Sequence, residues 1–260
     1  NDVVMNNSPI DIDKLIEGTN EILTANRNSL QLFDMLHSMR QFDDLTYVHS
    51  VNVALIASIL GQWLKFSEKD IRILTISGLL HDIGKIMIPN EILTKPGKLT
   101  VAEYNIMKQH VNFGYEKVKN QNIDIRIKEA CLLHHEKCDG TGYPFGLKSD
   151  HIPAVAKIIA IADVYDAMTS ARVYRGALCP FEVIDTMYKD AFTKFEPEYI
   201  LPFLKNVASS YINNDVRLSD GRIGKVVLIN ENALSLPIVQ CEDEFIDLSK
   251  TRGLTVSAIL

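Results

Sequence analysis

Histidines and acidic residues occur in two short polar segments that can bind metal ions. The first segment, His81–Lys85, reads HDIGK, and the second, His134–Pro144, reads HHEKCDGTGYP. Nitrogen and oxygen ligands of these types suit iron, manganese, zinc, cobalt or nickel, so they do not identify one metal. The chain holds 7 histidines, and five of them fit a single site. These five are His49, His81, His110, His134 and His135.

The elements expected around these residues are helices that direct some polar side chains inward. His49 shares a helical face with Val53, Ile56 and Leu60, so it should point into the core. A lone inward histidine is usually a satisfied core residue, but here inward histidines and carboxylates recur on further segments. Asp163 lies among isoleucine, alanine and valine, where an uncompensated carboxylate would cost several kcal/mol. A cation beside Asp163 is the simplest explanation, and the adjacent histidines after RIKEACLL support the same argument.

His81 and Asp82 end the apolar run IRILTISGLL. On a helix they would lie about 100° apart, so both can approach one metal cluster. A carboxylate has two oxygens that can bridge two ions, and we predict that Asp82 is the bridging ligand. Lys85 follows by one helical turn and should stabilise charge on phosphoryl oxygens, the alternative being a solvated lysine at a helix end.

This ligand set predicts a hydrolytic reaction at phosphorus. Two cations about 3.5 to 4 Å apart lower the pKa of a bridging water, and the resulting hydroxide can attack the phosphorus atom. The cations also polarise a phosphate oxygen, so no serine or cysteine nucleophile is required. Asp82 and Lys85 are the expected catalytic residues.

Most of the chain has the pattern of packed helices. From Asp11 to about Leu204, apolar residues recur mostly at intervals of three and four. Thr100 and Glu103 have the spacing of a capping box, and prolines at positions 180 and 197 should open two later helices. Beyond Asn213, β-branched runs broken by turn signals such as Asp-Gly at 220–221 predict short strands.

We therefore predict an all-α helical bundle with a metal cluster in its core and a small C-terminal β-rich appendage. The expected divisions are a helical lead-in over residues 1–40, a catalytic domain over 41–212 and the appendage over 213–260.

Composition limits the partners that this chain can have. Its net charge of -6 provides no general basic patch for duplex nucleic acid, so a phosphorylated ligand must be held by a few local cations. The 4 cysteines are scattered and form no CxxC pair, which suits a reducing cytosol. We find no apolar stretch of about 18 residues and no signal peptide, which predicts a soluble, cytoplasmic chain. Position 1 is not methionine, so an upstream sensor or membrane segment stays open.

The motifs resemble those of the HD-GYP phosphodiesterases, a branch of the HD metal-dependent phosphohydrolase superfamily. The resemblance runs from about Asp43 to Leu204 and includes HDIGK, HHEKCDGTGYP and IADVYDAMTSARVYR in the family's order. It implies an all-α fold with a buried cluster of two or three metals, usually iron or manganese, that hydrolyses cyclic di-GMP. By position, the family's metal ligands correspond to His49, His81, Asp82, His110, His134, His135 and Asp163.

The resemblance also bears on the number of metals. Members with three metals have a glutamate four residues before the first histidine, and Leu45 occupies that position here. We therefore expect two divalent ions, with iron or manganese favoured.

The resemblance assigns further residues to the substrate. Arg172 and Arg175 would bind its phosphates, with a surface pair anchoring a loop as the alternative. Asp166 would be an orienting group close to the metals or to an arginine. Gly142, like Gly140, would allow positive φ and close backbone approach, which leaves Tyr143 and Pro144 to form the lip of the pocket. Tyr143 would stack a guanine or brace the loop.

One departure from the family affects this substrate assignment. Many relatives read TSDRPYR where this chain reads TSARVYR, so a carboxylate and a proline are missing beside the arginines. Substrate affinity is the property that we expect this difference to affect.

Three functions follow from this sequence. The first is hydrolysis of cyclic di-GMP to the linear dinucleotide pGpG and then to GMP. The second is hydrolysis of another cyclic dinucleotide, such as cyclic GMP-AMP, since no motif reads a base. The third is a sensor without turnover, which is disfavoured because the ligands and Lys85 are retained. A homodimer and a diguanylate cyclase are the macromolecular partners considered.

Overall fold

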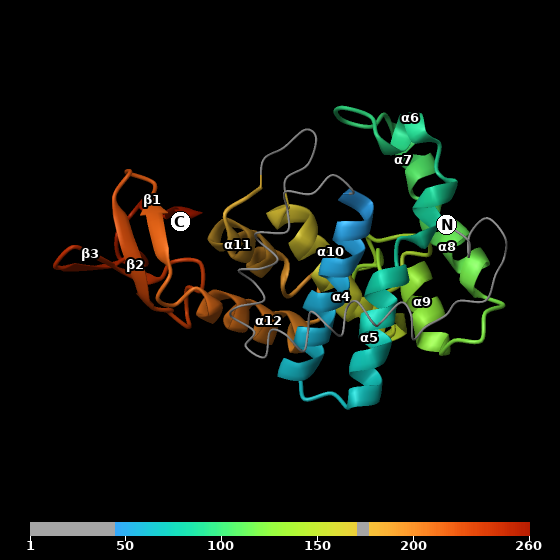
Figure 1. The fold of residues 1–260 in the computed structure, drawn as a ribbon, viewed down its shortest axis with the longest axis horizontal. Helices are drawn as coiled ribbons and strands as arrows, with labels where there is room; N and C mark the ends of the chain where they lie inside the picture. Colours follow the sequence, from blue (N-terminus) through green and yellow to red (C-terminus); the bar gives the residue numbers. More distant parts are fainter. Residues whose placement is uncertain (1–44, 171–176) are drawn as a thin grey trace.

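The computed structural model describes residues 45–170 and 177–260, and helices make up the first part of this range (Figure 1). The α-helices before the HHEKCDGTGYP segment are α4 (Leu45–Trp63), α5 (Glu68–Leu80), α6 (Asn90–Leu93), α7 (Val101–Met107), α8 (His110–Val118) and α9 (Ile125–Leu133). Those after it are α10 (Ala154–Thr169), α11 (Pro180–Asp190) and α12 (Pro197–Ser210). Two short 3-10 helices are η2 (Ile83–Met87) and η3 (Ser149–His151).

Local sequence signals explain where several helices begin. Thr100 and Glu103 form the predicted capping box: the Thr100 hydroxyl accepts from the Glu103 backbone N–H, and the Glu103 carboxylate accepts from the Thr100 backbone N–H. Pro180 and Pro197 occupy first-turn positions of α11 and α12, also as predicted. A side-chain cap therefore sets the start of α7, the helix that precedes the predicted metal ligand His110.

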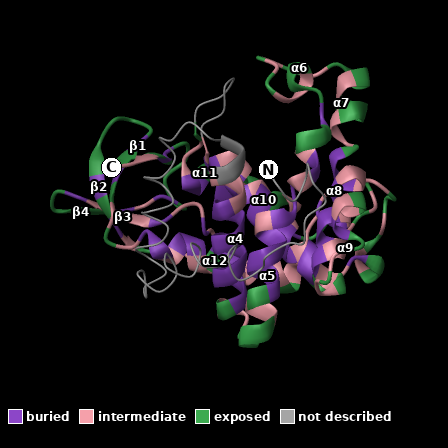
Figure 2. Ribbon diagram, turned by 45° about the vertical axis from the view of Figure 1, so that its right-hand side comes forward, coloured by how far each residue is buried: buried purple, intermediate pink, exposed green. Residues whose placement is uncertain are grey.

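The helices pack around α4, α5 and α10, whose buried faces form the centre of the molecule (Figure 2). Helix α9 contacts α5 and α10, and α8 contacts both α9 and η2. A close approach between α4 and α5 requires Gly78, because a Cβ there would lie 2.5 Å from the Ala54 Cα. The helices that surround the centre are therefore closely packed against one another.

The C-terminal part is a five-stranded antiparallel sheet with strand order β4-β3-β2-β1-β5. Its strands are β1 (Asp215–Leu218), β2 (Ile223–Leu228), β3 (Ile238–Cys241), β4 (Glu244–Asp247) and β5 (Val256–Ile259). In the β1–β2 hairpin, Asp215 pairs with Lys225. The predicted turn is present, with Gly221 at φ +93° and its N–H donating to the Leu218 carbonyl at 3.0 Å. The all-α prediction is therefore only partly right, because a small antiparallel sheet follows the helices; short strands were expected in this region.

The sheet shares its hydrophobic core with the helices. Buried residues such as Val216 and Val226 belong to the same apolar cluster as Ile184 and Val207. Strand β5 also contacts α11. Within the described residues, none of the helices has the length and apolar character needed to cross a bilayer.

Candidate metal centre

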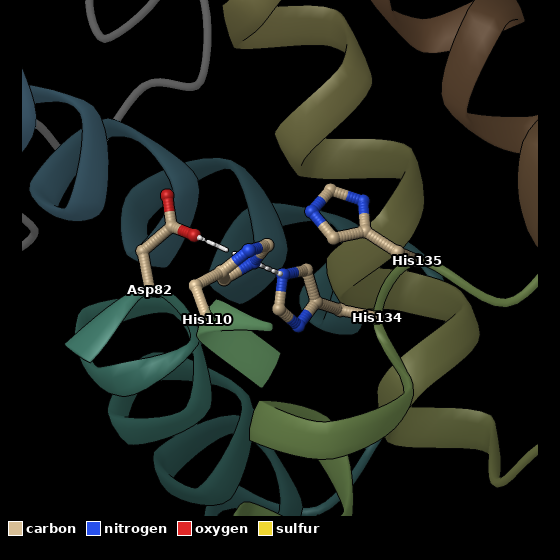
Figure 3. A group of neighbouring side chains, drawn as sticks. All are labelled: Asp82, His110, His134 and His135. Carbon is tan, nitrogen blue, oxygen red and sulfur yellow. Dashed lines mark hydrogen bonds and ion pairs between the residues drawn. The ribbon is translucent and has the colours of Figure 1, made fainter. Parts of the chain in front are cut away.

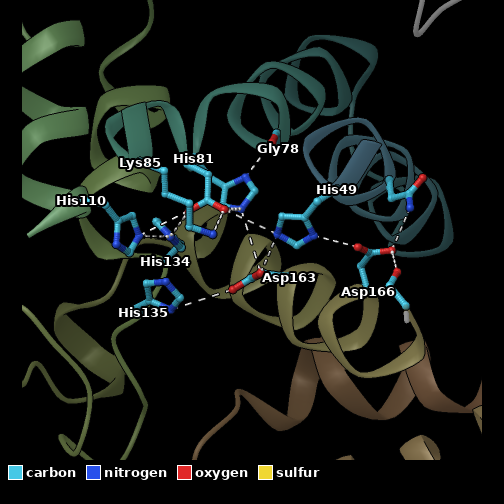
Figure 4. A network of polar contacts seen from close by, with 12 residues as sticks. His49, Gly78, His81, Lys85, His110, His134, His135, Asp163 and Asp166 are labelled. Carbon is cyan, nitrogen blue, oxygen red and sulfur yellow. Dashed lines mark hydrogen bonds and ion pairs between the residues drawn. The ribbon is translucent and has the colours of Figure 1, made fainter. Parts of the chain in front are cut away.

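The structure brings all seven predicted metal ligands together where several helices meet (Figure 4). His49 lies on α4 and Asp163 on α10, whereas the other five lie at or just beyond helix ends. The ligands form two groups, and in each group the candidate ligand atoms lie within 4.8 Å of one another. One group contains Asp82, His110, His134 and His135, and the other contains His49, His81 and Asp163.

Asp82 belongs to the first group, and its second oxygen faces the second group. Its Oδ1 is 3.3 Å from the His110 Nε2 and 3.9 Å from the His134 Nε2 (Figure 3). Its Oδ2 is 3.2 Å from the His81 Nε2 and 3.6 Å from the His49 Nε2. The Asp82 residue is only 3% exposed, so these neighbours shield it from bulk solvent. This is the geometry that a bridging carboxylate needs.

Asp163 spans the two groups in a similar way. Its Oδ1 lies 3.1 Å from the His49 Nε2 and 4.0 Å from the His81 Nε2. Its Oδ2 lies 3.8 Å from the His135 Nδ1. Both carboxylates are therefore surrounded by imidazoles, and no lysine or arginine among the described residues pairs with Asp163.

The expectation that Asp82 continues the helix of His81 is wrong. Helix α5 ends at Leu80 with His81 as its C-cap, and Asp82 has φ −100° and ψ 10° in the turn before η2. The turn lets Gly84 approach α8, since a Cβ on Gly84 would lie 2.0 Å from the His110 carbonyl oxygen. This contact sets the position of Asp82 beside His110.

Backbone carbonyls orient three of the histidines in the same way. The Nδ1 atoms of His81, His110 and His134 lie 2.7, 2.8 and 3.0 Å from the carbonyl oxygens of Gly78, Met107 and Ala130. A carbonyl only accepts, so each Nδ1 carries the proton and each Nε2 presents a lone pair to the centre. Sequence reasoning missed this feature, although each carbonyl lies only three or four residues upstream.

Asp166 orients His49 by a comparable contact. Its Oδ2 lies 2.7 Å from the His49 Nδ1, while its Oδ1 accepts from the Asn52 amide at 2.9 Å and the Ser170 hydroxyl at 3.1 Å. Asp166 is 1% exposed. Its contacts support the orienting role considered from the sequence, with His49 as the group that is oriented.

Several buried atoms at the centre lack hydrogen-bond partners among the described residues. They are the Nε2 atoms of His49 and His81 and the Oδ1 of Asp82. Although these atoms lie at ion-pair distances from neighbouring groups, their orientations do not make directed hydrogen bonds. Leaving buried polar atoms unsatisfied costs free energy, and a cation in contact with their lone pairs would remove that cost. The side chains present therefore fit divalent metal ions.

The protonation states also suit metal binding. Burial lowers the pKa of His110, lowers that of His134 well below its usual value and lowers that of His135 to about 4, so all three are neutral ligands at pH 7. Burial also acts to lower the pKa of His49, but the neighbouring carboxylates of Asp163 and Asp166 outweigh it and raise the pKa to about 9. A metal must displace a proton from His49.

The loop that contains Gly142, Tyr143 and Pro144, called the GYP loop below, is held by Glu136, a buried residue that was not predicted from the sequence. The Glu136 Oε1 accepts backbone N–H groups of Phe145 and Gly146 at 2.7 and 3.1 Å, and its Oε2 accepts that of Leu147 at 2.9 Å. Glu136 is 4% exposed, so this carboxylate is committed to the loop. The only available signal was its place directly after the two histidines.

The loop also contacts the candidate metal ligand His135 directly. The Tyr143 ring stacks on the His135 ring, with centroids 4.7 Å apart and an interplanar angle of 28°. The Tyr143 N–H donates to the His135 carbonyl at 3.2 Å. Gly142 is required for close approach, because a Cβ would lie 2.5 Å from the His135 carbonyl oxygen. Gly140 has φ +83°, whereas Gly142 is outside the positive-φ glycines, so the expectation of positive φ holds only for Gly140.

The other predicted site residues are Lys85, Pro144, Arg172 and Arg175. The Lys85 Nζ donates to the Asp82 Oδ2, which brings Lys85 to the metal centre rather than into solvent. Pro144 follows Tyr143 in the loop and is half-buried. Arg172 and Arg175 lie outside the described residues.

Comparisons with known proteins agree with these observations. The sequence model of the family described as HD domain matches residues 16–199. The chain is 36% identical over 203 residues to cyclic di-GMP phosphodiesterase PA4108 of Pseudomonas aeruginosa, which covers 78% of this chain and 49% of that protein. It is 32% identical over 188 residues to 3'3'-cGAMP-specific phosphodiesterase 2 of Vibrio cholerae, which covers 71% of this chain and 36% of that protein.

A solved structure gives the same result for the fold. Bd1817, an HDG"Y"P protein from Bdellovibrio bacteriovorus, matches with a TM-score of 0.60 and 21% identity, over 74% of this chain and 60% of that chain. The chain spans half or less of the length of the two curated relatives described above. The HD domain match, however, extends over most of this chain and includes both polar segments that supply the candidate metal ligands. The chain belongs to the HD domain family.

Proposed function

We propose that this chain is the catalytic part of an HD-GYP phosphodiesterase that hydrolyses cyclic di-GMP to pGpG, GMP or both. The observation that carries the proposal is the position of Asp82, whose two oxygens face two separate ligand groups. Curated relatives that are named cyclic di-GMP phosphodiesterases, with 36% identity to this chain, support the choice of substrate.

Two divalent cations, iron or manganese, are the proposed cofactors. His110, His134 and His135 would hold one ion, and His49, His81 and Asp163 the other, with Asp82 shared between them. When bound, such a pair lowers the pKa of a water and polarises a phosphate oxygen. Leu45 stands where a third metal would require a carboxylate, which supports two ions rather than three.

The surrounding residues orient these ligands and bind the substrate. Asp166 and three backbone carbonyls hold the imidazoles with their Nε2 atoms inward. Lys85 lies at the Asp82 carboxylate, where its ammonium group can stabilise negative charge that builds up on a phosphoryl oxygen. Arg172 and Arg175 are proposed to bind phosphate, while Gly142, Tyr143 and Pro144 shape the adjacent loop.

A second candidate is hydrolysis of a mixed cyclic GMP-AMP dinucleotide. It is favoured by relatives named 3'3'-cGAMP-specific phosphodiesterases, at 32% and 36% identity. A cyclic-dinucleotide sensor without turnover is less favoured, because the ligands and Lys85 are all present. A cytoplasmic location, a homodimer and a diguanylate cyclase partner stay predictions.

An anaerobic turnover assay tests the proposal. Protein reconstituted with Fe(II) or Mn(II) is incubated with cyclic di-GMP or 3'3'-cGAMP, products are separated by chromatography, and metal is counted in the same sample. We expect about two ions per chain and faster turnover of cyclic di-GMP. Turnover of 3'3'-cGAMP alone would select the second candidate, and a fully metallated protein that binds but does not cleave either would indicate a sensor.

A further inference from the structure

Helix α7 places an exposed aromatic ring and a lysine beside the metal centre. The helix and the preceding α6 extend away from the main helical body, and α7 leads directly into α8, whose first residue is the ligand His110 (Figure 1). Tyr104 on α7 is 49% exposed, which is high for an aromatic side chain. Lys108 follows one turn later, between the helix and His110.

Tyr104, Lys108 and Tyr143 form a continuous group. The Tyr104 and Tyr143 ring centroids are 6.5 Å apart with an interplanar angle of 81°. The Lys108 Nζ lies 5.3 Å from the Tyr104 centroid and 5.9 Å from the Tyr143 centroid. Tyr143 in turn stacks on His135 and lies 6.4 Å from His110. The group therefore connects the metal ligands to the exposed face of α7.

The charge on Lys108 is not committed to a carboxylate within the described part of the chain. Glu103, the acidic residue of α7, instead accepts from the Lys95 Nζ at 2.6 and 2.7 Å and completes the capping box. The Lys108 ammonium group therefore lies between two aromatic rings with donors available for another partner.

The metal ligands, Tyr143 and Tyr104 follow one another in space as the phosphate, ribose and base do in a nucleotide. A ribose separates a phosphate from its base, and here Tyr143 separates the metal ligands from the Tyr104 ring. An aromatic ring can stack on any base, because every base has a π face. A lysine discriminates between purines, because guanine offers two acceptors, O6 and N7, on the edge where adenine offers N7 and an amino donor.

We propose that Tyr104 and Lys108 form a guanine-binding subsite next to the metal centre. Tyr104 stacks on the base while the Lys108 ammonium group donates to its O6 and N7 edge. This inference rests on the proposed function, since it concerns the base of the nucleotide whose phosphate is cleaved. It gives this chain a means of preferring guanine over adenine, which none of the sequence motifs supplies.

The alternative is a purely structural pair, since Tyr104 and Lys108 have the i,i+4 spacing that stabilises helices. A structural pair would affect melting temperature without affecting base preference. The two roles therefore separate in a measurement of substrate discrimination.

The test compares four variants of the metallated full chain: Tyr104→Ala, Tyr104→Phe, Lys108→Ala and, as the matched control, Val101→Ala. Val101 lies on the same helix and is 80% exposed, away from the aromatic group. KM and kcat are measured with cyclic di-GMP and cyclic di-AMP, together with metal content and melting temperature.

Tyr104→Ala should raise KM for cyclic di-GMP by about 10-fold with little change in kcat, whereas Tyr104→Phe should retain wild-type KM. Lys108→Ala should reduce the preference for cyclic di-GMP over cyclic di-AMP by about 10-fold. If the wild type turns over normally and both Tyr104→Ala and Lys108→Ala keep its KM and its substrate preference, the subsite is overturned and the proposed function stays intact.

Failure of the proposed function gives a different result. If the metallated wild type cleaves neither dinucleotide, calorimetric titration with cyclic di-GMP repeats the comparison as Kd values for the same variants. The subsite would be supported if Tyr104→Ala binds cyclic di-GMP more weakly than the wild type while the control Val101→Ala binds it with wild-type affinity. A wild type that does not bind cyclic di-GMP, or equal affinities for all variants, would overturn it.

Discussion

Replacing Glu136 by glutamine should loosen the GYP loop and destabilise the protein. Its carboxylate accepts three N–H groups, at 2.7, 3.1 and 2.9 Å, from three consecutive residues. A glutamine has only one acceptor oxygen, so at least one N–H would face the amide NH2 group instead. Loss of one hydrogen bond to a charged group, with weakening of the other two, corresponds to about 2–4 kcal/mol of unfolding free energy.

The measurement is thermal unfolding of the metal-free protein, together with hydrogen exchange of the amides at 145–147. For a chain of this size, we expect the melting temperature to fall by roughly 5–15 °C. Glu129→Gln is the control, because Glu129 is half-buried on α9 and its side chain makes no hydrogen bond within the described residues. The loop amides should exchange faster in Glu136→Gln only.

Enzyme activity is a second measurement on the Glu136→Gln variant. The loop places Tyr143 against His135, so loosening it should also lower kcat/KM while metal content stays close to normal. Melting temperatures within about 1 °C of each other for wild type, Glu136→Gln and Glu129→Gln would refute the reasoning, because a buried three-fold acceptor cannot be lost without cost.

Four further predictions concern the centre itself. Asp82→Ala should reduce metal content from about two ions per chain to one or fewer and lower the rate with it, so normal metal and rate in that variant would exclude bridging. Lys85→Ala should keep its metals but lose about 100-fold in kcat, and a change confined to KM would make Lys85 a binding residue. Asp166→Asn should weaken metal affinity by about 10- to 100-fold through His49, whereas raised KM at normal metal affinity would favour a role towards substrate. Metal binding must displace the proton of His49, whose pKa is raised to about 9, so apparent metal affinity should increase as pH rises towards 9. Metal uptake at pH 7 should release about one proton, which calorimetry in buffers of different ionisation enthalpy would measure.

Burial cost alone pointed to part of the candidate ligand set, and the resemblance to the HD-GYP family supplied the rest. Asp163 in an apolar helix and the paired histidines after α9 required compensation, and the structure brings them to one place. The capping box at Thr100 and the turn at Gly221 were predictable because each depends on residues a few positions apart. Such local signals need no knowledge of tertiary packing.

Other features depend on contacts that a linear pattern does not contain. The turn at Asp82 is set by the approach of Gly84 to the His110 carbonyl, which joins segments that the sequence separates. Glu136 accepts from residues nine to eleven positions later, beyond any helical spacing. The proximity of Tyr104 to Tyr143 likewise arises only when α7 and the loop fold together.

The placement of ligands at helix ends has an electrostatic consequence. His81 and His134 are the C-caps of α5 and α9, so the carboxyl ends of both helices are directed at the centre. A helix carboxyl end carries about half a negative elementary charge, and a nearby cation gains about 0.3–1 kcal/mol from it. The peptide dipoles of two helices therefore attract cations independently of Asp82 and Asp163. Some affinity for divalent ions is thus built into the backbone and would persist when either carboxylate is replaced.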